Sequence, residues 1–206
     1  RDAAEKLARI PGTCPVIVDG LALGALDPSA VAAMSAPLVA LIHHPLAMEG
    51  GLEPSRREYL FQTERDNLRL ARHVIVTSPH TAELLGRDYG VARERITIAQ
   101  PGTDQPVLGP KAPGVPLIVS VGIQVPRKGH DVLLRALAQI VHLPWQAVIA
   151  GSALDADYGA TLEGMRVQMG LTNRVRLAGH VSGDELAELY GQASVFALAT
   201  RFEGYG

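Results

Sequence analysis

The chain has 206 residues, of which 47% are hydrophobic, 19% charged and only 4% aromatic, a composition typical of a globular protein that buries a core. Its 19 basic and 21 acidic residues leave a net charge of −2, which excludes the overall basic excess of a nucleic-acid-binding chain. The single cysteine, Cys14, excludes an internal disulfide and a cysteine-rich metal site.

Apolar runs in the first half of the chain alternate with segments of helical periodicity. The runs are continuous, as is typical of strands buried on both faces of a parallel sheet. Strands are expected at residues 14–19, 37–43, 73–77 and 95–99, and helices at residues 1–9, 55–71 and 81–89. Ser78 and Pro79 suit the N-cap and the first position of the last of these helices.

Residues 100–116 carry five prolines and three glycines and show no periodicity, which predicts a linker between two domains. We expect a partial first domain at residues 1–105 and a partial second domain at residues 106–206.

The same alternation resumes in the second half. Strands are expected at residues 117–121, 145–150, 175–178 and 194–198, and helices at residues 128–141, 158–169 and 183–192. Gly170 suits the C-terminal cap of the middle helix, and Ser182 with Glu185 forms a capping-box pattern. Strands and helices that alternate with short loops predict an α/β protein with parallel sheets.

Two adjacent cations, Arg127 and Lys128, follow the strand that ends before Gly122. Ligands of open parallel sheets bind beyond the carboxyl ends of the strands. Cations at a helix start can stabilise the negative charge of a diphosphate, because the free backbone amides and the helix dipole act in the same direction. The alternative is a solvated pair of cations at the start of a helix.

Further polar groups also follow strands. Glu203, with the flexible Gly204-Tyr205-Gly206, offers a carboxylate to sugar hydroxyls, although the same residues also suit a plain turn. His43, after the second strand, could bond a sugar or a phosphate or have a structural role. A metal site at His43-His44 with Glu49 and Glu53 fits no standard ligand spacing. The remaining histidines other than His180, among them His130, are interpreted as surface or packing residues.

Several common signatures are absent from the sequence. It has no P-loop motif, no G-x-G-x-x-G after a strand and no G-x-S-x-G elbow. These absences argue against a P-loop NTPase, a dinucleotide-dependent dehydrogenase and an α/β-hydrolase.

The order and spacing of several segments together resemble the retaining glycosyltransferases of the family-four, group 1 type, which have the GT-B fold. The segments that carry the resemblance are residues 76–78 with Thr81, 100–104, 117–122, 126–137, 148–151, 174–182, 186–190 and 202–206. The resemblance implies two Rossmann-like domains whose parallel sheets face a cleft, both of them incomplete in a chain that looks like a fragment.

The resemblance also implies roles for individual residues. Arg127 and Lys128 would hold the donor diphosphate, with Gly122 lining their loop. Glu203 would contact the donor sugar near the amides of Gly204, Tyr205 and Gly206, His180 and Val181 would edge the nucleobase, and His43 would face the sugar from the first domain. Ile123 departs from the family pattern, which often has an arginine there. The second glutamate of the family's pair would lie beyond residue 206, and the front of the first domain looks short.

A glycosyltransferase of this kind would move a sugar from a nucleotide-diphosphate sugar to an acceptor with retention of configuration, without a metal or another cofactor. The acceptor could be a sugar, a lipid or another small molecule, and nucleic acid is not an expected partner. We expect a cytoplasmic protein, with peripheral membrane contact left open, and a chain that is inactive by itself. The alternatives are a non-catalytic homologue and a nucleotide-sugar epimerase of similar architecture.

Overall fold

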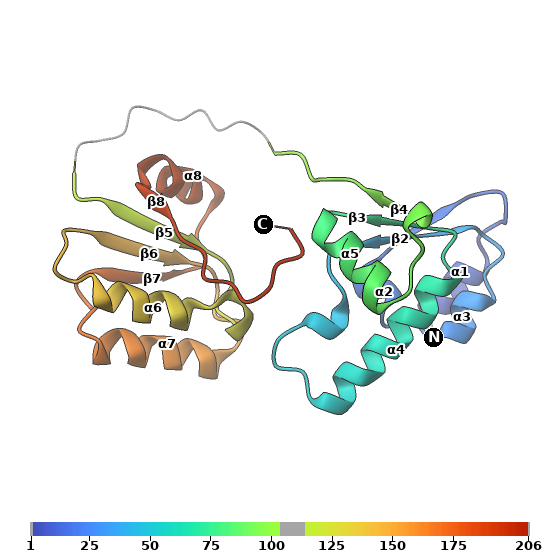
Figure 1. The fold of residues 1–206 in the computed structure, drawn as a ribbon, viewed down its shortest axis with the longest axis horizontal. Coiled ribbons are helices and arrows are strands. Elements are labelled where there is room, and N and C mark those ends of the chain that lie inside the picture. The colour runs from blue at the N-terminus through green and yellow to red at the C-terminus, as the bar shows by residue number, and fades with distance from the viewer. Residues whose placement is uncertain (1, 104–113, 206) are drawn as a thin grey trace. The chain divides into compact units, whose positions relative to one another are not determined.

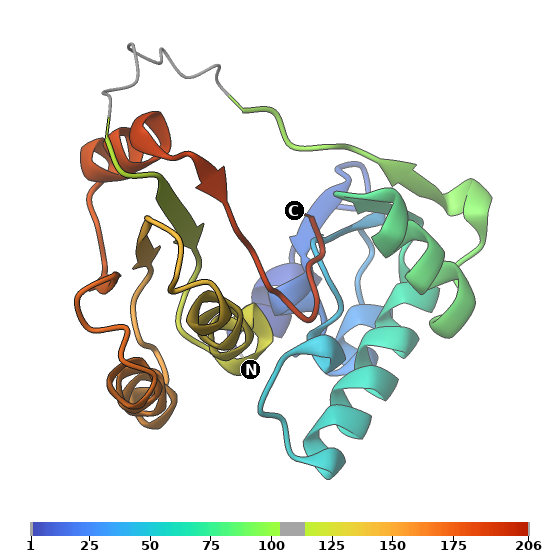
Figure 2. The ribbon, with the colours of Figure 1, turned by 60° about the vertical axis from the view of Figure 1, so that its left-hand side comes forward.

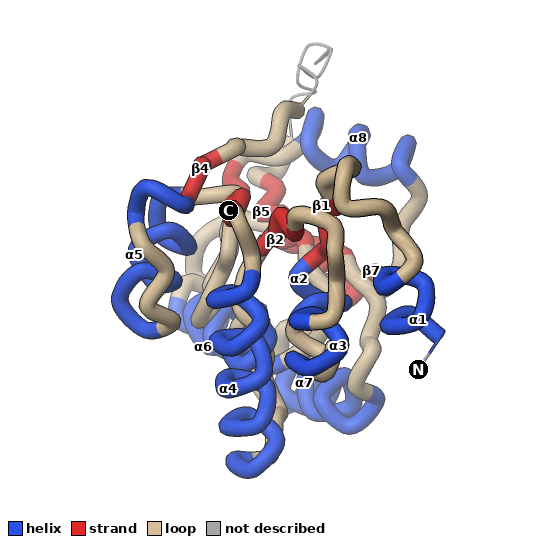
Figure 3. Tube along the Cα trace, turned by 90° about the vertical axis from the view of Figure 1, so that its right-hand side faces the viewer, coloured by secondary structure: helices blue, strands red, loops and turns tan. Residues whose placement is uncertain are grey.

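The computed structural model describes residues 2–103 and 114–205. The chain divides into two compact units, the first formed by Arg1–Thr103 with Glu203–Gly206 and the second by Asp104–Phe202. In both, strands alternate with helices along the chain (Figure 3). The predicted α/β class with parallel sheets is therefore confirmed, whereas the predicted domain boundary at residues 105 and 106 lies outside the described residues.

The first unit contains a parallel sheet of four strands in the order β1-β2-β3-β4. Its strands are β1 (Val16–Asp19), β2 (Leu38–Ile42), β3 (His73–Val76) and β4 (Ile96–Ile98). Asp19 pairs with Leu41 in the ladder, and Leu41 pairs with Ile75. Because all four strands run the same way, the residues that follow β1, β2 and β3 emerge at one edge of this sheet.

The helices of the first unit are α1 (Asp2–Ala8), α2 (Gly20–Leu23), α3 (Pro28–Ala32), α4 (Pro54–Leu70) and α5 (Pro79–Asp88), with 3₁₀ turns η1 (Leu46–Met48) and η2 (Arg93–Arg95). The predicted cap of α5 is confirmed, since the Ser78 hydroxyl accepts a hydrogen bond from the Thr81 amide. The short helices α2 and α3 were not expected, because four or five residues carry no periodicity. They are instead marked by N-cap aspartates, Asp19 and Asp27.

The second unit has a parallel sheet in the order β7-β6-β5-β8. Its strands are β5 (Leu117–Val121), β6 (Gln146–Ala150), β7 (Val175–Gly179) and the short β8 (Val195–Phe196). Helices α6 (His130–Gln139) and α7 (Ala156–Gln168) cover one face, and α8 (Gly183–Gln192) covers the other (Figure 1). A doubly wound arrangement of this kind places its ligand-binding edge at the carboxyl ends of the strands.

Two apolar clusters hold the layers of the second unit together. Leu134, Ile149 and Leu162 are fully buried between the sheet and the α6–α7 layer. Val119 and Leu189 belong to the cluster on the α8 face. Each fully buried side chain of this size contributes about 1.5–3 kcal/mol of hydrophobic stabilisation, so the sheet forms a firm base for the loops at its edge.

One local expectation is corrected at the start of α6. The helix begins at His130 instead of residue 128, and Pro126–Lys128 form a separate 3₁₀ turn, η3. Gly129 separates the two elements with a left-handed backbone, φ +66°. Arg127 and Lys128 therefore lie in a turn before α6, and not in its first turn.

Candidate functional site

The loops after β5, β6 and β7 meet at one edge of the second sheet. The Gly122 amide donates to the Ala150 carbonyl over 2.8 Å, and the Gly151 amide donates to the Gly179 carbonyl over 2.7 Å. These bonds join three strand ends through main-chain atoms. The Gly122 loop is therefore fixed by main-chain hydrogen bonds at this edge of the sheet.

The Lys128 side chain lies against Gly122. Its Cδ atom is 3.2 Å from the position that a Cβ atom on Gly122 would occupy. The Nε2–H of His130 donates to the Gly122 carbonyl over 3.1 Å from a fully buried ring. Burial lowers the pKa of His130, which favours this neutral, donating form.

The full burial of the His130 ring agrees with its interpretation as a packing residue. Its hydrogen bond to the Gly122 carbonyl was not expected from the sequence. The available signal was its place two residues after Lys128, at the first position of a helix that follows a left-handed glycine.

Arg127 is joined to the segment after β8, 75 residues further along the chain. Its Nη1 donates to the Phe202 carbonyl over 3.0 Å, and its own carbonyl accepts from the Arg201 amide over 2.8 Å. The Thr200 hydroxyl lies 3.0 Å from the same Arg127 carbonyl. Figure 2 shows the red segment after β8 passing the start of the yellow helix α6. The residues directly before Glu203 therefore rest on the turn that carries the two cations.

His180 and Val181 follow β7, next to the Gly179 carbonyl that binds the Gly151 amide. His180 is exposed and Val181 is half-buried. They consequently lie at the same edge of the sheet as the Gly122 loop, as the sequence predicts for residues that follow a neighbouring parallel strand.

In the first unit, His43 comes directly after β2, and its Nε2 lies 3.4 Å from the Asp19 carboxylate at the end of β1. Both side chains are about half exposed. The other Asp19 oxygen accepts from the Leu21 amide over 2.9 Å, which fixes the carboxylate at the start of α2. Asp19 was missed from the sequence, although the expected pairing of two parallel strands would have placed it beside His43.

The segment of Glu203 packs within the first unit, near His43. The Gly204 carbonyl accepts from the hydroxyls of Ser78 over 2.5 Å and Thr81 over 3.1 Å. A Cβ atom at position 204 would lie 2.2 Å from the His43 carbonyl oxygen, so only glycine permits this approach. Glu203 is half-buried, Tyr205 is exposed, and Gly206 lies outside the described residues.

His44 has a different environment from His43. Its Nε2 is hydrogen-bonded to the Glu49 carboxylate, and Glu53 occupies the N-cap position of α4. Within residues 2–103 and 114–205, no three histidine, cysteine or acidic side chains are grouped as metal ligands.

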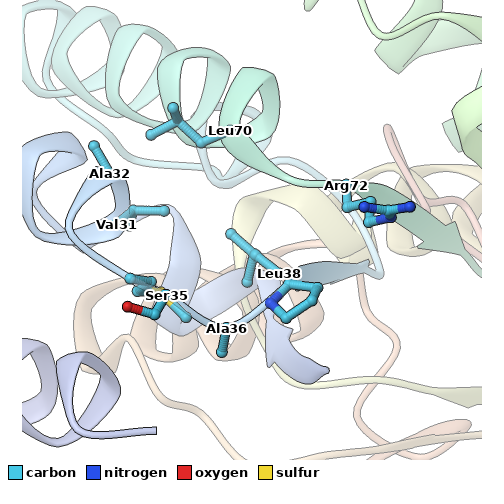
Figure 4. A pocket seen from close by; sticks show the side chains of 9 residues that line it. Val31, Ala32, Ser35, Ala36, Leu38, Leu70 and Arg72 are labelled. Carbon is cyan, nitrogen blue, oxygen red and sulfur yellow. The ribbon is translucent and has the colours of Figure 1, made fainter. Parts of the chain in front are cut away.

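A hollow in the first unit lies away from these groups (Figure 4). Leu38, which begins β2, and Arg72, which precedes β3, line it together with Leu70 at the end of α4. It is therefore at the amino ends of the strands, opposite the edge that carries His43. No described helix is long and apolar enough to span a membrane.

Family models match both halves of the chain. The family model for Glycosyltransferase Family 4 matches residues 17–105, and that for Glycosyl transferases group 1 matches residues 106–206. An MMP alpha-(1->4)-mannosyltransferase of Mycolicibacterium hassiacum is 26% identical over 98% of this chain and 52% of its own length. A mannosylfructose-phosphate synthase of Agrobacterium fabrum is 24% identical over 65% of this chain and 34% of its own length.

Solved structures show the same fold. Anabaena Alr3699/HepE in complex with UDP and glucose superposes with a TM-score of 0.75 at 19% identity, over 100% of this chain and 57% of its own. Sucrose-phosphate synthase from Thermosynechococcus elongatus superposes with a TM-score of 0.72 at 21% identity, over 93% of this chain and 51% of its own. The chain spans about half or less of the curated relatives named above. The two family models together match residues 17–206 and show that the chain belongs to the glycosyltransferases of the family-four, group 1 type; its solved neighbours show the GT-B fold.

Proposed function

We propose that the protein transfers a sugar from a nucleoside diphosphate sugar to an acceptor hydroxyl with retention of configuration. The observation that carries the proposal is that Arg127 binds the segment before Glu203 and Lys128 lies against Gly122, both at the carboxyl edge of one parallel sheet. Anabaena HepE, which shares the fold, was solved with UDP and glucose, and this supports a nucleoside diphosphate as the leaving group.

In this proposal Arg127 and Lys128 bind the diphosphate. Negative charge develops on the leaving diphosphate as the glycosidic bond breaks, and fixed cations stabilise it without reorganisation. The Arg127 guanidinium is held in place by the Phe202 carbonyl, and the Lys128 stem lies along Gly122. Two such cations can supply the charge that a metal ion supplies in other transferases, so we propose a metal-independent reaction.

Glu203 would accept hydrogen bonds from hydroxyls of the donor sugar, close to the amides of Gly204 and Tyr205. We propose that His43 contacts the same sugar, because Gly204 packs against the His43 carbonyl. The Asp19 carboxylate lies 3.4 Å from Nε2 of His43. Asp19 would orient the imidazole ring and so act on the sugar through His43. His180 and Val181 would edge the nucleobase from the end of β7.

The experiment is donor turnover by the full gene product, with the anomeric configuration of the product read by NMR. UDP-glucose, GDP-mannose and ADP-glucose are offered with a panel of sugar and polyol acceptors, with and without EDTA. A product of retained configuration, formed equally with EDTA, is the expected result. An inverted product or loss of turnover on chelation would contradict the mechanism, and interconversion of the donor without acceptor would identify an epimerase.

A further inference from the structure

Asp131, in the first turn of α6, is the centre of a polar cluster that the proposed reaction does not explain. Its side chain is only 12% exposed, and both of its oxygens bind Arg201, over 3.1 and 2.9 Å. The Tyr158 hydroxyl donates to one oxygen over 2.9 Å, and Arg135 donates to the other over 2.9 Å. Arg201 lowers the pKa of Asp131 far below its usual range, outweighing burial, so the carboxylate stays charged.

Arg201 connects this carboxylate to the cation-bearing turn in two further ways. Its guanidinium also binds the Pro126 carbonyl, and its amide donates to the Arg127 carbonyl. A single residue thus ties three positions of the 126–131 segment, from η3 to the first turn of α6, to the loop that follows β8. Arg201 lies two positions before Glu203 along the chain.

We propose that the Asp131–Arg201 pair is a positioning device that holds residues 200–202, the loop leading to Glu203, on the turn of Arg127 and Lys128. The inference rests on the proposed function, since it assigns the pair to the alignment of the donor sugar with its diphosphate. A planar guanidinium that binds a carboxylate with two parallel bonds fixes orientation as well as distance, which a lysine cannot reproduce. Small displacements matter because an error of about 1 Å at a reacting centre can slow a reaction by about 100-fold.

Arg135 provides a matched comparison. It binds the same carboxylate over the same distance as Arg201 Nη2, but it lies one turn along α6, on the same helix as Asp131. If Asp131 only stabilised the fold through its charge, removing either arginine would have similar effects. If Asp131 acts through the loop, only removal of Arg201 or of Asp131 itself slows the reaction.

The test uses the variants Asp131→Asn, Arg201→Gln and Arg135→Ala, and the double variant Asp131→Asn/Arg201→Gln, in the full gene product. Turnover is measured as nucleoside diphosphate released from the donor that the wild type uses, and affinity as the Kd for UDP, GDP or ADP. We expect kcat to fall about 10- to 100-fold in Asp131→Asn and Arg201→Gln, with a change in Kd below about threefold. Arg135→Ala should stay within about twofold of wild type, and the double variant should be no slower than the worse single variant.

Amide hydrogen exchange at residues 200–202 provides a readout that needs no activity. It should rise in Asp131→Asn and Arg201→Gln, with no rise in Arg135→Ala, while Trp145 fluorescence shows that the second unit stays folded. Wild-type kcat in both Asp131→Asn and Arg201→Gln, or equal losses in all three single variants, would overturn the positioning role. A wild type that neither binds nor turns over any donor would refute the proposed function. In that case, unchanged amide hydrogen exchange at residues 200–202 in the variants would separately refute the positioning role of the Asp131–Arg201 pair.

Discussion

Replacing Gly129 by alanine should disrupt the packing of the loop after β8 against the turn that carries Arg127 and Lys128. The left-handed backbone, φ +66°, strains any other residue by about 1–2 kcal/mol. The new Cβ atom would also lie 1.8 Å from the Ala199 carbonyl oxygen, whereas ordinary contact begins at 3.4 Å. The loop must therefore move by more than 1 Å, which disrupts the bonds that Arg201 and Thr200 make to Arg127, each worth about 1 kcal/mol. We expect a total loss of about 3–4 kcal/mol in the free energy of unfolding of the second unit.

Gly170 offers a matched control for this substitution. Its φ is +67°, but a Cβ atom there would meet nothing within 4 Å. Gly170→Ala should therefore cost only the backbone strain, about 1–2 kcal/mol. The difference between the two variants isolates the clash with Ala199.

Urea unfolding followed by tryptophan fluorescence measures both losses. The chain has one tryptophan, Trp145, which is 3% exposed and packs in the core of the second unit. Its fluorescence thus reports the unit in which Gly129 and Gly170 both lie. Equal losses of stability in the two alanine variants would refute the argument that the loop after β8 is packed on Gly129.

Two further predictions concern the first unit. Burial raises the pKa of the Glu64 carboxyl from 4.5 to about 7, so the folded state binds a proton more tightly than the unfolded state. The contribution of the protonated Glu64 carboxyl to stability is full below pH 4.5. As the pH rises through 7, this contribution, about 3 kcal/mol, is lost. Glu64→Gln should remove this pH-dependent loss, measured by urea unfolding followed by circular dichroism at pH 5 and pH 8. Ser78→Ala removes both the cap of α5 and a hydrogen bond to the Gly204 carbonyl, and should cost about 2 kcal/mol. Ser182→Ala removes only a cap of α8, should cost about 1 kcal/mol, and serves as its control in the same assay. A Glu64→Gln protein with wild-type pH dependence, or equal losses in the two serine variants, would contradict these assignments.

Much of the fold was predictable because its signals are local. Continuous apolar runs identified the strands, and Ser78 and Ser182 marked the helix starts that the structure confirms. The capping-box pattern holds only in part, because the Glu185 carboxylate pairs with Arg176 on β7. The start of α6 was misplaced because helical periodicity runs through Gly129, whose left-handed backbone breaks the helix.

The contacts that assemble the site depend on strand order, which periodicity does not contain. The order β7-β6-β5-β8 brings β8 beside β5, so that Arg201 reaches Asp131 across 70 residues of sequence. The pairing of β1 with β2 likewise brings Asp19 to His43. Interpretation of single residues proposed Arg127 and Lys128 as site residues, but it could not identify these partners.

Calorimetric titration of the full gene product with UDP, GDP and ADP measures whether Arg127 and Lys128 bind a diphosphate. The comparison is with Arg127→Ala/Lys128→Ala, and Arg135→Ala serves as a control that removes a nearby cation outside the proposed diphosphate site. We expect micromolar binding of one nucleotide to the wild type and to the control, and a loss of affinity of at least about 100-fold in the double variant, as for two charged contacts. Equal binding by the double variant and the wild type, or no binding by a well-folded wild type, would contradict this expectation.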